Sequence, residues 1–86
     1  MKKIVGILNP FDATQSFYFY EDGNRIDRLT CSLNEIPSSL ISFASNYGVT
    51  DVDVSGPQFF SQAIVKEIDT YMINKYNAKK INVNII

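Results

Sequence analysis

The chain has 86 residues, of which 45% are hydrophobic, 20% charged and 13% aromatic, as in ordinary globular proteins. This length suits one domain, so we expect a single compact domain over residues 1–86. The 8 basic and 9 acidic residues give a net charge of −1, and the basic residues are scattered along the sequence. Because sequence-independent binding to nucleic acids rests on clustered Lys and Arg, we do not expect a nucleic-acid partner.

The cysteine and histidine content excludes several kinds of chemistry. Cys31 is the only cysteine, which rules out an internal disulfide and is typical of a reducing compartment. Histidine is absent, so the chain has no imidazole for metal binding, catalytic triads or proton transfer near neutral pH. The first apolar run, residues 4–8, is too short for a signal peptide or a membrane span. We expect a cytoplasmic protein with no membrane, metal or cofactor.

The first part of the chain predicts an antiparallel meander of strands. Residues 3–8 are a short apolar run, expected to be a strand buried on both faces. Residues 16–21 (SFYFYE) are aromatic-rich and favour a second strand. Asp22-Gly23 is a favoured pair for a tight type I′ turn, after which residues 25–32 return as a third strand.

The next segment changes to a helical period. Its apolar stripe consists of Ile36, Leu40, Phe43, Ala44 and Tyr47. Asn34 is the predicted N-cap, and Gly48 fits the glycine that ends a helix.

The last part of the chain predicts a strand, a long helix and a final strand. Residues 51–55 alternate, with Val52 and Val54 on one face. Pro57 fits the first position of a helix over residues 57–77, capped by Ser55 or Gly56. Residues 80–86 (KINVNII) alternate again.

The element order is therefore β-β-β-α-β-α-β. Right-handed β-α-β crossovers make the fourth and fifth strands parallel to the first. The predicted fold is a single five-stranded mixed α/β sheet of order 3-2-1-4-5, with both helices on one face.

This order resembles the ribonuclease H-like superfamily, which includes the actin-like and heat-shock chaperone ATPases as well as nucleases and resolvases. In the chaperone-type ATPases a strand ending in Gly-Ile-Asp enters a phosphate-binding Gly-Thr-Thr turn, and Gly6-Ile7 matches its beginning. Leu8 stands in place of the Asp, and the turn over residues 9–14 contains no glycine. Residues 52–56 (VDVSG) resemble the glycine turn between strand and helix in these ATPases, with Gly56 as their only glycine.

The resemblance implies a nucleotide or metal site where the 9–14 turn faces Gly56. The candidate ligand-binding residues are Asn9, Asp12, Thr14, Asp53, Ser55 and Gly56. The alternative is a solvated turn in which Asp12 or Thr14 bonds the local backbone. A two-metal nuclease needs several converging carboxylates, and Asp53 alone lies where that pattern requires one. We therefore expect no catalytic residues.

Polar side chains on the last two strands predict that one face of the sheet is uncovered. Asp53 and Ser55 share a face of one strand, and Asn82 and Asn84 are expected on the same face of the next. A sheet covered on both faces would carry apolar residues at these positions.

The second strand predicts what the uncovered face presents. Its Phe residues are assigned to the helices, and Tyr18 and Tyr20 to the uncovered face. The predicted interaction surface is Tyr18, Tyr20, Asn82 and Asn84. Tyrosine supplies a large, rigid contact area with a polar tip. Exposed aromatics on a sheet also stack RNA bases, but without basic neighbours, and with Asp53 repelling phosphate, a protein surface is favoured.

The third strand is expected at the edge of the sheet. Arg25, Asp27 and Arg28 are charges of the kind that discourage edge-to-edge pairing. Cys31 is interpreted as a small buried hydrophobe.

We expect a small, non-catalytic binding or regulatory module that acts through a protein partner or by forming a homodimer. The alternatives are a nucleotide- or metal-binding domain and a degenerate ribonuclease H-like nuclease. A monomer whose tyrosines only shield the sheet is a further alternative. Small single-domain proteins of this sort are common in phage and mobile-element genomes, and we expect such a source.

Overall fold

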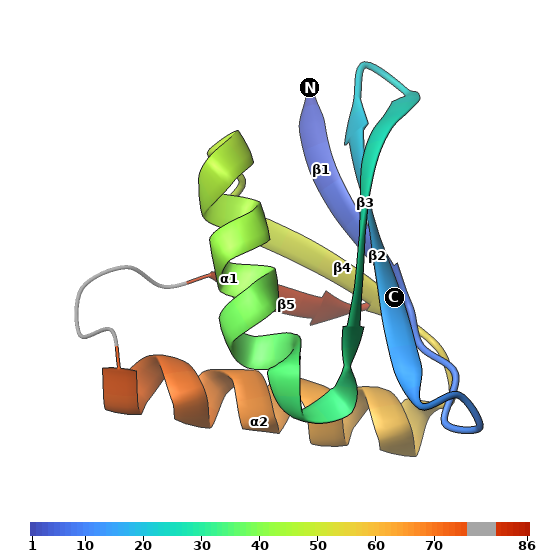
Figure 1. The fold of residues 1–86 in the computed structure, drawn as a ribbon, viewed down its shortest axis with the longest axis vertical. Helices are drawn as coiled ribbons and strands as arrows, with labels where there is room; N and C mark the ends of the chain where they lie inside the picture. The colour runs from blue at the N-terminus through green and yellow to red at the C-terminus, as the bar shows by residue number, and fades with distance from the viewer. Residues whose placement is uncertain (76–80) are drawn as a thin grey trace.

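A computed structural model of the chain describes residues 1–75 and 81–86, which form a mixed sheet and the helices that pack on it (Figure 1). The sheet has five strands in the order β3-β2-β1-β4-β5, which confirms the predicted topology. The elements are β1 Lys2–Ile7, β2 Thr14–Glu21, β3 Asn24–Ser32, a 3₁₀ turn Leu33–Glu35, α1 Ile36–Tyr47, β4 Asp51–Ser55, α2 Gln58–Lys75 and β5 Asn82–Ile85.

The meander forms for the local reasons that the sequence indicates. β1 pairs antiparallel with β2, and β2 pairs antiparallel with β3. Asp22 and Gly23 both have positive φ, 52° and 83°, as a type I′ turn requires. Gly48 ends α1 with a φ of 67°. β4 and β5 extend the sheet in parallel on the other side of β1.

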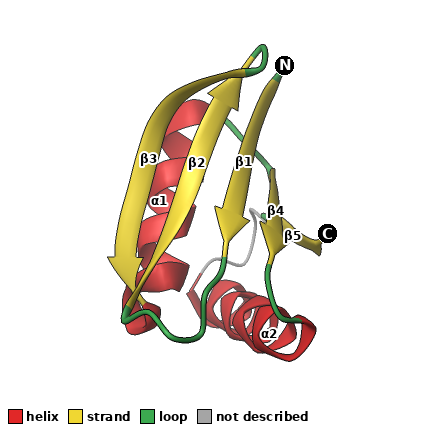
Figure 2. Ribbon diagram, turned by 90° about the vertical axis from the view of Figure 1, so that its right-hand side faces the viewer, coloured by secondary structure: helices red, strands yellow, loops and turns green. Residues whose placement is uncertain are grey.

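The two faces of the sheet differ in what covers them. α1 packs on β3, and α2 packs on β4 and β5, so that strands and helices share one hydrophobic core. Figure 2 views the sheet with α1 behind β2 and β3. We call the opposite side of the sheet the open face. Its residues are Lys3, Val5, Ile7, Ser16, Tyr18, Tyr20, Arg25, Arg28, Thr30, Asp51, Asp53, Ser55, Asn82 and Asn84.

The core confirms the predicted division of the strands. Phe17 and Phe19 are fully buried, whereas Tyr18 and Tyr20 between them are half-buried. Val52 and Val54 are also fully buried. The long helix contributes Ile64, Ile68 and Met72. Each fully buried aromatic or aliphatic side chain stabilises the fold by about 1.5–3 kcal/mol relative to exposure.

Gly6 has a packing role that explains why no larger residue stands there. A Cβ atom at this position would lie 2.5 Å from Cε1 of Phe17 and 3.3 Å from Cγ1 of Val54. Real Cβ atoms essentially never lie as close as 2.5 Å to another group, and 3.3 Å is tighter than most of their contacts. The Phe17 ring therefore occupies the space that a side chain at Gly6 would need.

Three local predictions are wrong. β1 is not buried on both faces, because Val5 is half-buried and Ile7 is 59% exposed on the open face. Asn34 is not the N-cap of α1: the chain first makes the 3₁₀ turn, and Glu35 takes the cap position without a side-chain bond. Pro57 lies one position before the first helical residue, since its carbonyl accepts the N–H of Ser61. Residues 76–77 of the predicted helix and residue 80 of the predicted strand lie outside the described residues.

Candidate functional site

The turn between β1 and β2 is built around a buried glutamine. The side chain of Gln15, only 2% exposed, accepts the N–H of Asn9 through Oε1 at 2.7 Å. Its Nε2 donates to the carbonyl oxygens of Asn9 at 2.7 Å and Asp12 at 3.1 Å. The three bonds satisfy all the polar atoms of the amide except one lone pair and fix the turn from inside.

The other polar groups of this turn also bond one another. Asn9 Oδ1 accepts the N–H of Phe11 at 3.0 Å, as in an Asx turn, and Asn9 Nδ2 donates to Asp12 Oδ2 at 3.1 Å. Thr14 is exposed and begins β2 opposite Ser32. The geometry therefore gives Asn9 and Asp12 a local structural use, in the spirit of the solvated-turn alternative. The side chains that bond the backbone are those of Asn9 and Gln15, however, and not those of Asp12 or Thr14 that the alternative named.

The predicted ligand residues are only partly brought together. The N–H of Leu8 donates to the carbonyl of Ser55 at 2.7 Å, which holds the start of the turn beside Gly56. A Cβ at Gly56, whose φ is 150°, would lie 2.6 Å from the carbonyl oxygen of Leu8. This close backbone approach accounts for the glycine. Asp53 points to the open face instead, where Asn84 Nδ2 donates to its Oδ1 at 3.3 Å.

Carboxylates do not gather into a metal centre in the described part of the chain. No group of at least three Cys, Asp or Glu side chains is placed to hold a metal ion in residues 1–75 and 81–86. α1, over residues 36–47, contains no acidic residue to bring a second carboxylate toward Asp53.

The open face carries a continuous row of side chains across all five strands. The strand register pairs Arg28 with Tyr18, Tyr18 with Val5, Val5 with Asp53, and Asp53 with Asn84. Cross-strand neighbours on one face lie about 4.5–5.5 Å apart at Cβ, so this row is one connected surface. A second row pairs Arg25 with Tyr20 and Tyr20 with Lys3.

The arginines of this surface are brought together by an irregularity in β3. Residues three apart on a regular strand point to opposite faces, which would separate Arg25 from Arg28. The register shifts between Phe19 and Tyr20 and skips Ile26, so both arginines reach the open face. The guanidinium carbon of Arg25 lies 5.0 Å from the centre of the Tyr18 ring, within cation–π range. The interpretation that the tyrosines lack basic neighbours is therefore wrong.

The helix-covered side of the same edge strand holds a different arrangement. Asp27 accepts the hydroxyl of Tyr47 at 2.5 Å, and the Tyr47 ring stacks on Phe19 with centroids 3.9 Å apart. The Tyr47 hydroxyl, helped by the backbone N–H of Arg28, lowers the pKa of Asp27, while Asp27 raises the pKa of Tyr47. Burial, with a smaller effect of Glu35, raises the pKa of the Cys31 thiol, as predicted for a residue that is packed rather than reactive.

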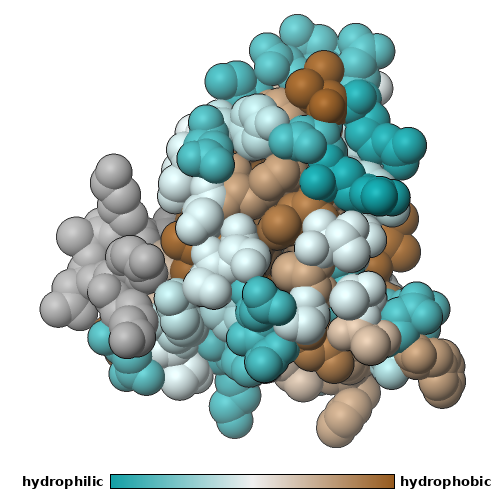
Figure 3. All heavy atoms as spheres, viewed as in Figure 1, coloured by the Kyte–Doolittle hydropathy of each residue, from teal (hydrophilic) through white to brown (hydrophobic). Residues whose placement is uncertain are grey.

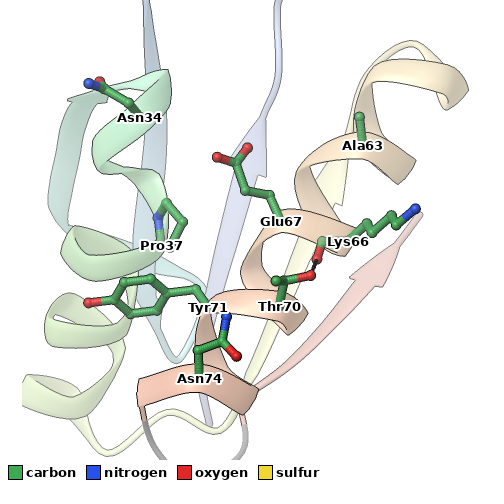
Figure 4. A pocket seen from close by; sticks show the side chains of 8 residues that line it. All are labelled: Asn34, Pro37, Ala63, Lys66, Glu67, Thr70, Tyr71 and Asn74. Atoms are coloured by element: carbon green, nitrogen blue, oxygen red, sulfur yellow. Dashed lines mark hydrogen bonds between the residues drawn. The ribbon is translucent and has the colours of Figure 1, made fainter.

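A shallow groove of about 570 Å³ lies between the start of α1 and the middle of α2 (Figure 4). Its lining residues are Asn34, Pro37, Ala63, Lys66, Glu67, Thr70, Tyr71 and Asn74. The Tyr71 ring lies toward Pro37, whereas Lys66 points away from the groove, and Thr70 donates its hydroxyl to the Lys66 carbonyl. The polar groups of the groove do not converge on one point, so it offers shape without a defined chemistry.

Two phenylalanines that the sequence analysis does not single out are almost fully exposed. Phe11 in the β1–β2 turn is 94% exposed, and Phe59 at the start of α2 is 86% exposed. In Figure 3 apolar atoms gather at the lower right, where Figure 1 places this turn and the start of α2. An aromatic inside a polar turn is the sequence signal for Phe11. For Phe59 the signal is the helical period, because it places the neighbouring Phe60 toward the core and leaves Phe59 on the solvent side.

Comparison with known proteins identifies no similar protein. No protein-family model, curated protein or solved structure matches this chain. Among the helices in the described ranges, none is long and apolar enough to cross a membrane.

Proposed function

We propose that this protein is a small binding module that acts without catalysis and uses the open face to contact another protein. The observation that carries the proposal is the composition of the row through Tyr18, Val5 and Asp53. Rigid aromatics, arginine and a few apolar side chains on an uncovered sheet are the residues enriched in protein interfaces. Half-buried tyrosines flanked by charges suit a contact that forms and dissociates.

The open face is favoured over the other candidate surfaces for a physical reason. The turn at Asn9 uses its polar groups internally, and the groove beside Tyr71 lacks convergent polar groups. The exposed Phe11 and Phe59 offer apolar area without neighbouring charge complementarity. Among the surfaces of the described residues, the open face alone combines area, aromatic anchors and ordered charges.

The proposal is tested by removing the same amount of aromatic surface from two places. The double variant Tyr18→Ala with Tyr20→Ala removes the anchors of the open face, and Phe11→Ala with Phe59→Ala is the matched control. Tagged wild type and both tagged variants are used to co-purify partners from the native host. Untagged chain is present as well, so that a second copy of the protein can also be captured. We expect the amount of co-purified partner to fall at least tenfold with the tyrosine variant and to stay unchanged with the phenylalanine variant. The reverse pattern contradicts the proposal.

The topological resemblance supplies the second candidate, a nucleotide or metal site between the Asn9 turn and Gly56 in a ribonuclease H-like domain. What favours it is the closeness of Leu8 and Gly56 at the carboxyl ends of β1 and β4, where α/β sheets commonly bind ligands. A thermal-shift panel of Mg²⁺, Mn²⁺, ATP and cyclic nucleotides tests it. A ligand at 100 times its dissociation constant adds about 2.7 kcal/mol to stability, and a flat response contradicts this candidate.

A further inference from the structure

We propose that the partner on the open face is a second copy of this chain, packed face to face about a two-fold axis parallel to the strands. This inference rests on the proposed function and names its partner. It follows from how charge is distributed over the face, from the position of the tyrosines relative to the apolar residues, and from the size of the sheet.

Opposite charges are separated on the open face. Arg25 and Arg28 lie on β3, whereas Asp51 and Asp53 lie on β4. β2 and β1 run between these strands, so the two groups are about 14 Å apart at the usual strand spacing. Within residues 1–75 and 81–86, neither Arg28 nor Asp53 forms an ion pair, and Asp53 has only the amide of Asn84 as a partner. Each molecule thus presents a cationic strip on β3 and an anionic strip on β4, with Lys3 as a further cation on β1, the strand next to Asp51.

A two-fold rotation makes such a face complementary to itself. An axis parallel to the strands, between β2 and β1, places β3 of one copy over β4 of the second. Arg28 of each copy then faces Asp53 of the other, which gives two symmetric ion pairs in an isologous interface. An axis perpendicular to the strands would instead place β3 over β3 and bring arginine against arginine. Charge therefore selects the first axis.

The same rotation gives the uncharged side chains suitable contacts. β2 of one copy lies over β1 of the other, so Tyr18 covers Val5, and Ser16 lies over the exposed Ile7. Asn82 and Asn84 on β5 fall outside the paired strands, at the edge of the contact. The result is an aromatic and aliphatic centre with a polar rim, the usual anatomy of a protein interface. Sheets packed in this aligned way sit about 10 Å apart.

The size of the sheet limits how stable the dimer can be. The four strands that pair in the dimer span about 19 Å across, and β1 and β4, with six and five residues, limit the contact to about 17–20 Å along the strands. This area lies at the small end of specific interfaces, so we expect a dissociation constant in the micromolar range. The dimer should accordingly assemble and separate over the concentrations used in solution experiments.

Charge exchange tests the arrangement directly. Arg28→Asp puts a carboxylate at both ends of the row that joins positions 28 and 53, and Asp53→Arg puts a guanidinium at both ends. We expect sedimentation velocity to show each variant dimerising at least tenfold more weakly than wild type. An equimolar mixture should form a heterodimer, because both carboxylates at positions 28 and 53 of the first variant then face guanidiniums of the second. The double exchange in a single chain should restore the homodimer.

A matched pair of substitutions controls for net charge. Lys66→Asp and Glu67→Arg change the charge by the same amounts on the exposed side of α2 and should leave dimerisation unchanged. Circular dichroism confirms that each variant is folded. If the mixture stays monomeric while wild type dimerises, or if the α2 pair weakens the dimer equally, the proposed register is overturned.

Two further outcomes separate this inference from the proposed function. Wild type that remains monomeric up to millimolar concentration overturns self-association, yet the co-purification above still decides whether the open face binds another protein. If Arg28→Asp weakens and Asp53→Arg strengthens binding of a labelled single-stranded RNA, with no dimer seen, the arginine–tyrosine strip is a nucleic-acid surface and both proposals are overturned.

Discussion

The two faces of β2 show how one short strand is divided between folding and recognition. Phe17 and Phe19 are fully buried under the helices, while Tyr18 and Tyr20 stand half-buried on the open face beside arginines. All four are aromatic and lie within four positions of one another. The difference between them is what each side meets: a close-packed core on one face and an adjustable, charged surface on the other.

This contrast shows where sequence constraint is strict and where it is loose. On the covered face a change of a few atoms disturbs close packing, because protein interiors have little free volume. On the open face, the same change affects mainly what can bind. Substitutions on the covered face of β2 should therefore mainly lower stability, whereas substitutions on its open face should mainly weaken association.

The largest difference is expected between Phe19→Ala and Tyr18→Ala. Phe19 is fully buried and stacked on Tyr47, so its truncation should cost about 3–5 kcal/mol. Tyr18 loses a cation–π contact with Arg25 and partial burial, which should cost about 1 kcal/mol. Urea denaturation monitored by circular dichroism measures both. Equal losses would mean that the open face is part of the core.

A smaller effect is expected at Gly6, which tests the packing of the covered face from the strand side. Gly6→Ala puts a methyl group into the Phe17 ring, and the overpacking should cost about 1–3 kcal/mol. This outweighs the roughly 0.5–1 kcal/mol that Ala gains over Gly in a strand. Combining Gly6→Ala with Phe17→Leu should recover part of the loss relative to the sum of the single changes; strict additivity would show that the two residues do not compete for space.

The smallest effect concerns the hydrogen bond between Tyr47 and Asp27 at the edge strand. Tyr47→Phe keeps the stack on Phe19 and removes the hydroxyl. The bond lowers the pKa of Asp27, so its stabilisation is present above the ordinary carboxyl pKa, about 3.9, and is lost as pH falls through the lowered value. Wild type should be slightly more stable than Tyr47→Phe at pH 7, with the gap closing toward pH 3 in urea titrations. A gap independent of pH would show that the bond does not form.

The raised pKa of Tyr47 gives the same pair a limit at high pH. A neutral tyrosine favours the bond, so the stabilisation is complete below the ordinary tyrosine pKa, about 10, and fades as pH rises through the raised value. The advantage of wild type over Tyr47→Phe should therefore decrease again in strongly alkaline solution.

Much of the fold could be predicted because local rules and global topology agree. The Asp22-Gly23 turn fixes the β2–β3 register at its start, and the alternation of Phe17 with Tyr18 assigns the two faces. The stripe of Ile36 and Leu40 identifies α1, and right-handed crossovers then leave one reasonable strand order. Each of these signals lies within a few residues of the structure it specifies.

The errors come from features that no local pattern reveals. The register shift beside Tyr20 puts Arg25 and Arg28 on one face. A bulge of this kind cannot be recognised from the spacing of the charged residues in the sequence. The polar turn depends on Gln15, whose side chain points inward and binds the backbone of Asn9 and Asp12, and a glutamine at this position carries no local signal of that role. Likewise, Ile7 is exposed because none of the described helices packs on the open face, and its neighbours in the sequence do not indicate this.

The most direct test of the open face as the contact surface is a dilution series of amide NMR spectra of the wild-type protein. Concentration-dependent shifts should fall on Val5, Tyr18 and Asp53, at the centre of the row, with little change in the buried stripe of α2. Shifts confined to Phe11, Phe59 or the groove beside Pro37 would place the contact elsewhere and contradict the account.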